Sequence, residues 1–316
     1  MNSRAVPFGV CAFLLTLGGF LLWWILDRGQ EWKSISLGGE KVTHVCWIHQ
    51  GDAVLAAAGK RLHCHAHPAG NSIATADLAA EVTAMLPTES GILIALDNGS
   101  LHLHEADGLT CLKSWTNTPA GIVHCLALSR DGNQVALGGD KGIVLWNRPN
   151  RAFAEALLPV PKKVMSVAWS SSVSITFTCS DTRLRTISLG DGEITESKKL
   201  GTPLEAIAAD ANGRIVTGNK NGGVALWKRN LASAEMSRDT VGGAIESLSA
   251  APNGKWIAAA GQDQRLHLCD FSGPTNPVIS LRGHKGRIHQ VAVHPNSEWI
   301  ASGSSDGTIK IWKTPS

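Results

Sequence analysis

The stretch that decides the fold is RIHQVAVHPNSEWIASGSSDGTIKIWK, residues 287–313. Apolar and polar residues alternate in three short runs, which HPNSE at 294–298 and SSDGT at 304–308 separate. Alternation with a period of two predicts strands with one buried face, and Gly, Asn, Asp and Pro between the runs predict turns. We therefore expect three antiparallel strands joined by tight turns.

This pattern recurs along the chain, for example as AIESLSAAPNGKWIAAAGQDQRLHLCD at 244–270 and IVHCLALSRDGNQVALGGDKGIVLWNR at 122–148. A fourth strand is predicted between successive units, as in PVISLRG and SIATADL. Equivalent positions recur seven times at intervals of 39 to 43 residues: His65, His104, Trp146, Ile187, Trp227, Cys269 and Trp312. A period near 40 residues is typical of repeat proteins, and it decides the architecture.

An Asp or Asn stands six positions before most of these reference residues. The set is Asp306, Asp263, Asn221, Asp181, Asp140 and Asn98, with Gly59 in the first repeat. Short Asx side chains accept hydrogen bonds from backbone amides in tight turns, so these residues are predicted to cap turns.

The chain resembles the WD-repeat β-propeller family over residues 31–316. The last repeat carries the match, because His284 after Gly283, Ser302, Asp306 and Trp312 correspond to the family's hydrogen-bonded tetrad. Other repeats keep less of the motif, and the Asp that follows Trp in the family is missing. The resemblance implies an all-β fold, a seven-bladed propeller of four-stranded antiparallel blades.

The two ends of the propeller are expected to meet. The last repeat stops after its third strand, while WKSISLGGE at 32–40 reads as an outer strand without a blade of its own. We expect residues 32–40 to complete the seventh blade. The predicted organisation is an anchor and short linker at 1–30 and a propeller at 31–316.

Residues 5–26, AVPFGVCAFLLTLGGFLLWWIL, contain no charged side chain. As a helix this segment is roughly 33 Å long, which matches a hydrocarbon core of about 30 Å. A cleaved signal peptide and a buried helix are the alternatives, but DRGQEW at 27–32 offers no small-x-small cleavage site. We expect a single transmembrane α-helix before the propeller, contacting the lipid bilayer.

The side of the membrane is decided by two opposed signals. Basic residues flank the apolar segment almost evenly. Six cysteines lie outside it without paired or metal-type spacing: Cys46, Cys64, Cys111, Cys125, Cys179 and Cys269. Buried reduced thiols favour a reducing compartment, so we expect a cytoplasmic propeller and an N-terminus on the other side.

Histidine is the residue type that suggests chemistry. His63 and His65 in the first repeat, and His102 and His104 in the second, are spaced to share one strand face and could bind a metal ion. Other repeats place tryptophan and lysine at the same positions, so blade packing is the simpler interpretation. No carboxylate or cysteine has a spacing that completes a site, and we expect no metal and no cofactor.

The sequence carries no signature of a catalytic site, such as a phosphate loop, a GxSxG elbow or an HExxH helix. The net charge of +3 does not favour nucleic acid as a partner. We therefore expect a non-enzymatic scaffold or accessory subunit of a membrane protein assembly. A metal- or redox-active propeller and a small-ligand sensor that uses the central channel are the alternatives.

The family resemblance implies that partner proteins dock on the face where the first strand of each blade begins. The matching positions are Lys41, Glu81, Ile122, His124, Lys163, Met165, Glu205, Glu246, Arg287 and His289, together with Thr43 and Thr83. An ordinary solvated rim is the alternative interpretation of this mixed set.

Overall fold

The computed structural model describes residues 30–315 except 159, 161, 211, 229, 241, 274 and 275. The predicted membrane anchor at 5–26 lies outside the described residues. Within the described part, regular structure consists of β-strands and one 3-10 turn, η1 (His49–Gly51). No helix of this part is both long enough and apolar enough to cross a bilayer.

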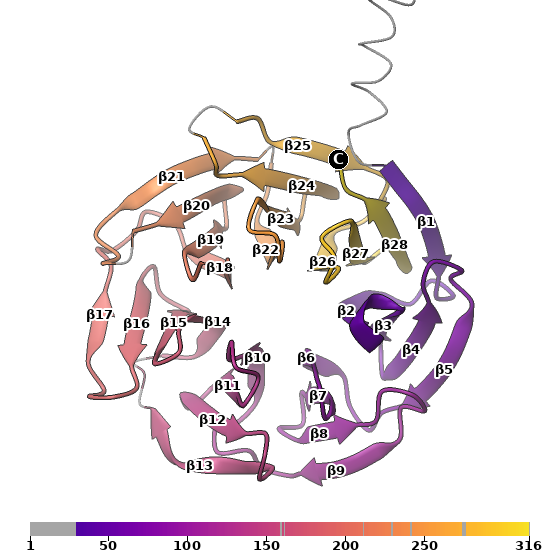
Figure 1. Cartoon of the computed structure of the whole chain (residues 1–316), viewed down its shortest axis with the longest axis horizontal. Coiled ribbons are helices and arrows are strands. Elements are labelled where there is room, and N and C mark those ends of the chain that lie inside the picture. Colours follow the sequence, from indigo (N-terminus) through magenta and orange to yellow (C-terminus); the bar gives the residue numbers. More distant parts are fainter. Residues whose placement is uncertain are drawn as a thin grey trace, which may run out of the picture.

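The strands form seven antiparallel four-stranded sheets, arranged as a ring of blades around a central axis (Figure 1). The all-β propeller predicted from the repeats is thereby confirmed. Blade 1 contains β2 (Val42–Ile48), β3 (Ala53–Ala58), β4 (Arg61–Ala66) and β5 (Ser72–Asp77). Blade 2 contains β6 (Val82–Thr88), β7 (Gly91–Leu96), β8 (Leu101–His104) and β9 (Cys111–Trp115). Blade 3 contains β10 (Val123–Leu128), β11 (Gln134–Gly139), β12 (Ile143–Asn147) and β13 (Ala152–Leu158).

The remaining blades follow in chain order, and the first strand of each lies nearest the axis (Figure 1). Blade 4 contains β14 (Val164–Ser171), β15 (Ser174–Cys179), β16 (Leu184–Ser188) and β17 (Ile194–Glu196). Blade 5 contains β18 (Leu204–Ala209), β19 (Ile215–Asn219), β20 (Gly223–Trp227) and β21 (Ala234–Asp239). Blade 6 contains β22 (Ile245–Ala250), β23 (Trp256–Gly261), β24 (Arg265–Asp270) and β25 (Ile279–Arg282). Blade 7 contains β26 (Ile288–Val293), β27 (Trp299–Ser304), β28 (Thr308–Lys313) and, from the other end of the chain, β1 (Gln30–Ser36).

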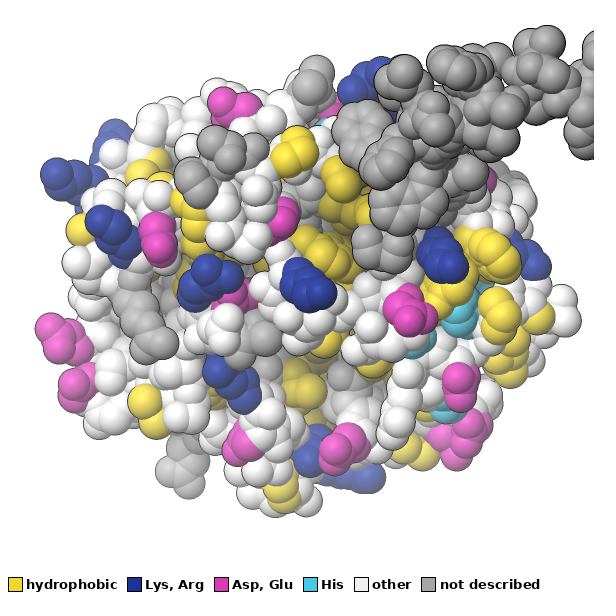
Figure 2. Space-filling view, turned by 45° about the horizontal axis from the view of Figure 1, so that its top comes forward, with side chains coloured by type: hydrophobic (Ala, Val, Ile, Leu, Met, Phe, Trp, Pro, Cys, Tyr) yellow, Lys and Arg dark blue, Asp and Glu magenta, His cyan; other side chains and the backbone are white. Residues whose placement is uncertain are grey.

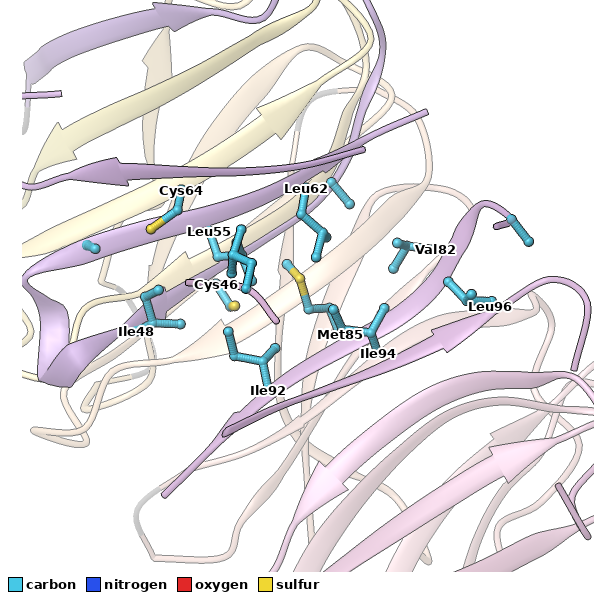
Figure 3. Close-up of a cluster of buried hydrophobic side chains, with 14 residues drawn as sticks. Cys46, Ile48, Leu55, Leu62, Cys64, Val82, Met85, Ile92, Ile94 and Leu96 are labelled. Carbon is cyan, nitrogen blue, oxygen red and sulfur yellow. The ribbon is translucent and has the colours of Figure 1, made fainter. Parts of the chain in front are cut away.

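The hydrophobic core lies between the blades. Each of the seven buried clusters joins side chains of two neighbouring blades. Between blades 1 and 2, Leu55 and Leu62 pack against Met85, Ile92 and Ile94 (Figure 3). Because both faces of a blade are covered by its neighbours, strands such as AVLAAA at 53–58 are apolar throughout and fully buried. No blade can bury its core without the next one.

The ring is closed by β1, which pairs antiparallel with β28. The strand covers residues 30–36 and a turn follows it, so it begins and ends earlier than the predicted 32–40. Nζ of the buried Lys310 on β28 donates to Oε1 of Glu31 at 2.6 Å and to Oγ of Ser34 at 3.2 Å. The rings of Trp32 and Trp299 meet edge to face at 5.4 Å. The two ends of the chain thus share one sheet, and blade 7 gains its outer strand.

The turn caps agree with the predicted set in four of its six positions. Oδ1 of Asp306, Asp263, Asp181 and Asn98 accepts the amide two residues ahead, at 3.0 to 3.2 Å. In blade 5 the cap is Asn219, whose Oδ1 accepts the amides of Asn221 and Gly223, so the prediction for Asn221 is wrong. Asp140 instead accepts a hydrogen bond from Nε2 of His124 at 2.8 Å.

Deletion of residues 31–40 tests the closure. The truncated chain is expected to aggregate or to lose much of its thermal stability, because β28 becomes an exposed edge and blade 7 keeps three strands. Thermal denaturation and light scattering of the detergent-solubilised protein measure this. A melting curve equal to that of the full chain would contradict closure by β1.

Candidate interaction surface

We call the end of the ring at which β2, β6, β10, β14, β18, β22 and β26 begin the upper face, and the opposite end the lower face. Five of the residues predicted to bind partners line the central channel below the upper face: His124, Met165, Glu205, Glu246 and His289. Another five stand immediately before the first strands, at the rim: Lys41, Glu81, Ile122, Lys163 and Arg287. The structure therefore places the set around one opening.

Part of this set is committed to holding the blades together. The inner edge of each first strand has no strand partner, so its backbone groups need other hydrogen-bonding groups. Polar side chains of adjacent blades supply them: Gln290 to Val45, Ser166 to Ile207, Ser247 to Val291, Ser249 to Val293, His44 to Thr83 and Thr83 to Val123, at 2.6 to 3.2 Å. These polar residues of the channel wall, Thr83 among them, are structural. This role was not predicted from the sequence, although a polar residue recurs in nearly every first strand.

His44 is an ionisable residue of the channel wall, and its burial there disfavours the charged form of the imidazole. Burial is the main cause that lowers the pKa of His44 to about 4; the nearby His289 and Lys41 act in the same direction, and the backbone hydrogen bond to Thr83 acts against them. The imidazole is therefore neutral at pH 7, and its Nε2–H donates to the carbonyl of Thr83 at 3.2 Å. His44 joins blades 1 and 2 without carrying a charge.

Other predicted residues are paired within the ring. Glu246 accepts from Nε of Arg287 at 2.8 Å and lies 3.3 Å from Nδ1 of His289. His289 also contacts Oγ of Ser305 at 2.8 Å. His124 is held by Asp140. Ile122, His124 and Met165 are half-buried.

The channel itself is small. Its cavity has a volume of about 240 Å³ and is lined by the first strands of all seven blades. Sites for small ligands usually measure about 300–1,000 Å³ and are mostly apolar. Polar groups dominate this wall, and most of them already have partners, so the channel offers little support for a ligand sensor.

Six exposed lysines lie at the upper face of blades 3 to 5, and of these Lys163 alone was predicted from the sequence to bind a partner. They belong to turns and inter-blade loops: Lys141, Lys162, Lys163, Lys198, Lys199 and Lys220. We call them the lysine arc. The pairs at 162–163 and 198–199, each just before a first strand, were the available signal. Figure 2 shows basic and acidic side chains interspersed over the visible face, with histidines grouped on one side.

The structure brings the four residues of the last repeat together. Trp312 Nε1 donates to Oγ of Ser302 at 2.7 Å, and Ser302 contacts Nε2 of His284 at 2.7 Å. Nδ1–H of His284 donates to Oδ2 of Asp306 at 2.8 Å. These hydrogen bonds join β27 and β28 to the loop that precedes blade 7. The group is structural, since His284 and Ser302 are buried.

The carboxylate of Asp306 is the acceptor at the end of this chain. Partial burial raises the pKa of Asp306, but hydrogen bonds from Thr308, the amide of Lys285 and His284 outweigh it and hold the pKa at about 2. Asp306 is therefore ionised at pH 7.

The histidine candidates lie where the strand pattern predicts. His63 and His65 share one face of β4, and His102 and His104 share one face of β8, each pair with stacked rings. The expectation that no cysteine completes such a set is wrong, because Cys111 on β9 lies opposite His104. The expectation of buried thiols also fails there, since Cys111 is exposed. By contrast, burial raises the pKa of Cys125 and of Cys269 to about 12.

Asp306→Ala is expected to lower the free energy of unfolding at pH 7 by about 1–3 kcal/mol, the usual cost of leaving buried partners unsatisfied. Because the pKa of Asp306 is lower in the folded protein than in the unfolded chain, its stabilising contribution depends on pH. That contribution is fully present above the unfolded pKa of about 3.9 and is lost as the pH falls toward the folded pKa. The gap between the two proteins should therefore narrow below pH 4.

Denaturation curves across this pH range measure the difference. Asp97→Ala, at an exposed turn of blade 2, is the matched control and should cost less than about 0.5 kcal/mol. Equal effects of the two substitutions would contradict the role of Asp306.

Comparison with known proteins agrees with the ring. The sequence profile of the family "WD domain, G-beta repeat" matches residues 109–147, 237–270 and 275–313. The serine-threonine kinase receptor-associated protein of Mus musculus is 27% identical over 203 residues, which cover 61% of this chain and 55% of that protein. Its counterparts in Bos taurus and Homo sapiens are each 26% identical over 208 residues, again 61% of this chain and 55% of theirs. The chain thus aligns with little more than half the length of these relatives. The matched repeats are similar to those of this family, and the seven-bladed ring agrees with that similarity.

Proposed function

We propose that this protein is a non-enzymatic scaffold whose upper face binds a partner protein through an acidic segment. The observation that carries the proposal is the lysine arc. Its six side chains are exposed and come from three consecutive blades of one rigid ring. Charges fixed on a rigid surface favour an oppositely charged partner and speed its encounter.

The lysine arc keeps most of its charge available. Among the described residues, one ion pair involves it, Lys163 Nζ to Asp140 Oδ1 at 3.9 Å, and both side chains are more than 40% exposed. A pair of this kind contributes little in water. The lysines are thus free to meet acidic side chains of another protein.

Several carboxylates of the same face are already engaged elsewhere. Asp181 holds Arg185 at 2.7 Å, Asp263 holds His267 at 2.7 Å, and Asp306 holds His284 at 2.8 Å. They lie in turns and face the inside of their own blades. Internal neutralisation of the lysine arc is therefore limited.

A scaffold role also fits the relatives, whose name describes association with a receptor that is a serine-threonine kinase. The analogy concerns protein binding and does not identify this chain's partner. The propeller supplies a fixed surface, and binding needs no moving part. Ser302, His284 and Asp306 form a hydroxyl–imidazole–carboxylate chain, but His284 and Ser302 are buried and the hydroxyl also accepts from Nε1 of Trp312, so we assign this chain a structural role.

The membrane part of the proposal rests on residues 5–26. This uncharged segment is long enough to span a bilayer, and Gln30 already belongs to β1, so such an anchor would hold the ring close to the membrane surface. Confinement to a membrane raises the effective concentration of membrane-bound partners. We place the ring on the cytoplasmic side, and an alkaline phosphatase fusion after Ser316, active only if exported, tests that placement.

The double charge reversal Lys162→Glu and Lys199→Glu tests the docking surface. Replacing attraction by repulsion at two sites should reduce the recovery of co-purifying membrane proteins by more than about tenfold, or about 1.4 kcal/mol. Purification in mild detergent with quantitative mass spectrometry measures the recovery.

The matched control reverses two exposed lysines of the lower face, Lys228→Glu and Lys255→Glu. This variant should retain the partners of the natural chain. If the two variants lose the same proteins equally, or the lysine-arc variant loses none, the upper face is not the docking surface.

A further inference from the structure

The outer half of blade 2 carries a compact group of two imidazoles and one thiol. One potential ligand atom from each of His102, His104 and Cys111 lies within 4.8 Å of the others. His104 on β8 lies directly opposite Cys111 on β9, and His102 projects from the same face two residues earlier. The two rings are nearly parallel, with 9° between their planes and 5.8 Å between their centroids. Antiparallel pairing thus assembles the group from two neighbouring strands.

The hydrogen bonds around His102 show which of its two ring nitrogens carries the proton. The amide and the hydroxyl of Ser100 both donate to Oδ1 of Asn98, at 3.0 and 2.7 Å. With its only proton used, the hydroxyl of Ser100 accepts from Nε2–H of His102 at 3.0 Å. Nδ1 of His102 therefore keeps its lone pair, and this nitrogen lies 3.9 Å from Sγ of Cys111.

The hydrogen bonds of His104 leave the other nitrogen unprotonated. Its Nδ1–H donates to the carbonyl oxygen of Leu109 at 2.8 Å. Its Nε2 consequently carries a lone pair, is buried, and has no hydrogen-bond partner among the described residues. The side chain of His104 is only 4% exposed. A buried polar atom without a partner is costly, so it calls for an explanation.

Both imidazoles have the arrangement that metal ligands show in proteins, with one nitrogen donating to an oxygen and the other free to bind. Burial lowers the pKa of His102, and the nearby His104 lowers it further, so His102 is neutral at pH 7. Cys111 is exposed, which gives an ion a path from solvent. Its thiol also approaches the carbonyl oxygen of Lys113 at 3.6 Å.

We propose that His102, His104 and Cys111 bind one thiophilic metal ion, Zn²⁺ or Cu⁺. Two imidazoles and one thiolate suit both ions, and solvent can complete a four-coordinate zinc site. Tetrahedral zinc holds its N and S ligands about 3.3–3.6 Å apart, so ligand atoms that lie within 4.8 Å of one another must close in by up to about 1.5 Å. On binding, the thiol of Cys111 releases its proton to solvent and the thiolate binds the ion.

Blade 1 provides an internal control. His63 and His65 on β4 repeat the histidine pair, and Nδ1 of His65 contacts the carbonyl oxygen of Gly70 at 3.2 Å. Across the strand, however, they face Thr75 and Ser72. Within the described ranges, blade 2 alone has a third ligand for its pair. The control and the proposed site thus differ by the thiol.

Metal binding by the full chain in detergent tests the proposal. After chelator treatment and dialysis, we expect one equivalent of Zn²⁺ or of Cu⁺ to be retained, and competition between the two identifies the preferred ion. Co²⁺ used as a probe should show a thiolate-to-cobalt charge-transfer band. Cys111→Ser should abolish the band, and His104→Gln should weaken binding by more than about tenfold. The variant His63→Gln with His65→Gln should bind as the natural chain does.

Alkylation of the natural chain gives a second readout that needs no substitution. Cys111 should react with a maleimide, Zn²⁺ or Cu⁺ should slow that reaction, and a chelator should restore it, as followed by peptide mapping. His102→Gln should remove the protection even if His104→Gln fails to fold. Alkylation unaffected by either ion, or a Cys111→Ser protein that binds like the natural chain, would overturn the proposal.

Discussion

The pairing of β1 with β28 is the constraint on which the rest of the structure depends. Every buried cluster lies between two blades, so each blade is stable only where it has a neighbour on both sides. A ring open at one interface would expose the cluster that joins blades 7 and 1. Closure by a strand from the opposite end of the chain prevents this, and Lys310 is buried against Glu31 at that junction. Seven separately marginal sheets become one rigid body.

The hydrogen bonds that make the ring rigid also determine which side chains of the upper face remain free to bind a partner. The innermost strands have one unpaired edge each, and hydrogen bonds such as those from the amides of Val45 and Val291 to neighbouring blades satisfy it. Many polar side chains of the channel wall are therefore already hydrogen-bonded to a neighbouring blade. What remains for recognition is the rim, where loops between blades carry side chains with few internal partners. The side chains available to bind a partner are thus those that neither close the ring nor satisfy the inner edges of the first strands.

The sequence predicted those features that depend on local pattern. Alternation and turn residues repeat in every unit, so the number of blades and the position of the third strands could be inferred. The outer strand of the last blade was predicted at residues 32–40 and is found at Gln30–Ser36. The sequence was less informative about positions that depend on how strands pair and how their turns are built. Asn219 caps its turn in place of Asn221, although the connection between β19 and β20 has three residues, as do the equivalent connections of blades 6 and 7. Cys111 is placed across from His104 by the length of the loop at 105–110, and no spacing rule along one strand could show that. The lysine arc, apart from Lys163, was equally hidden, because it combines loops from three repeats.

The central claim is that partner proteins bind the upper face, and site-specific photo-crosslinking tests it most directly. A photoreactive residue in place of Lys199 samples the upper face, and one in place of Val173, which is 57% exposed, samples the lower face. Irradiation of the full chain in its native membrane should give a crosslinked protein from position 199 and none from position 173. Crosslinks from position 173 with none from position 199 would contradict the account.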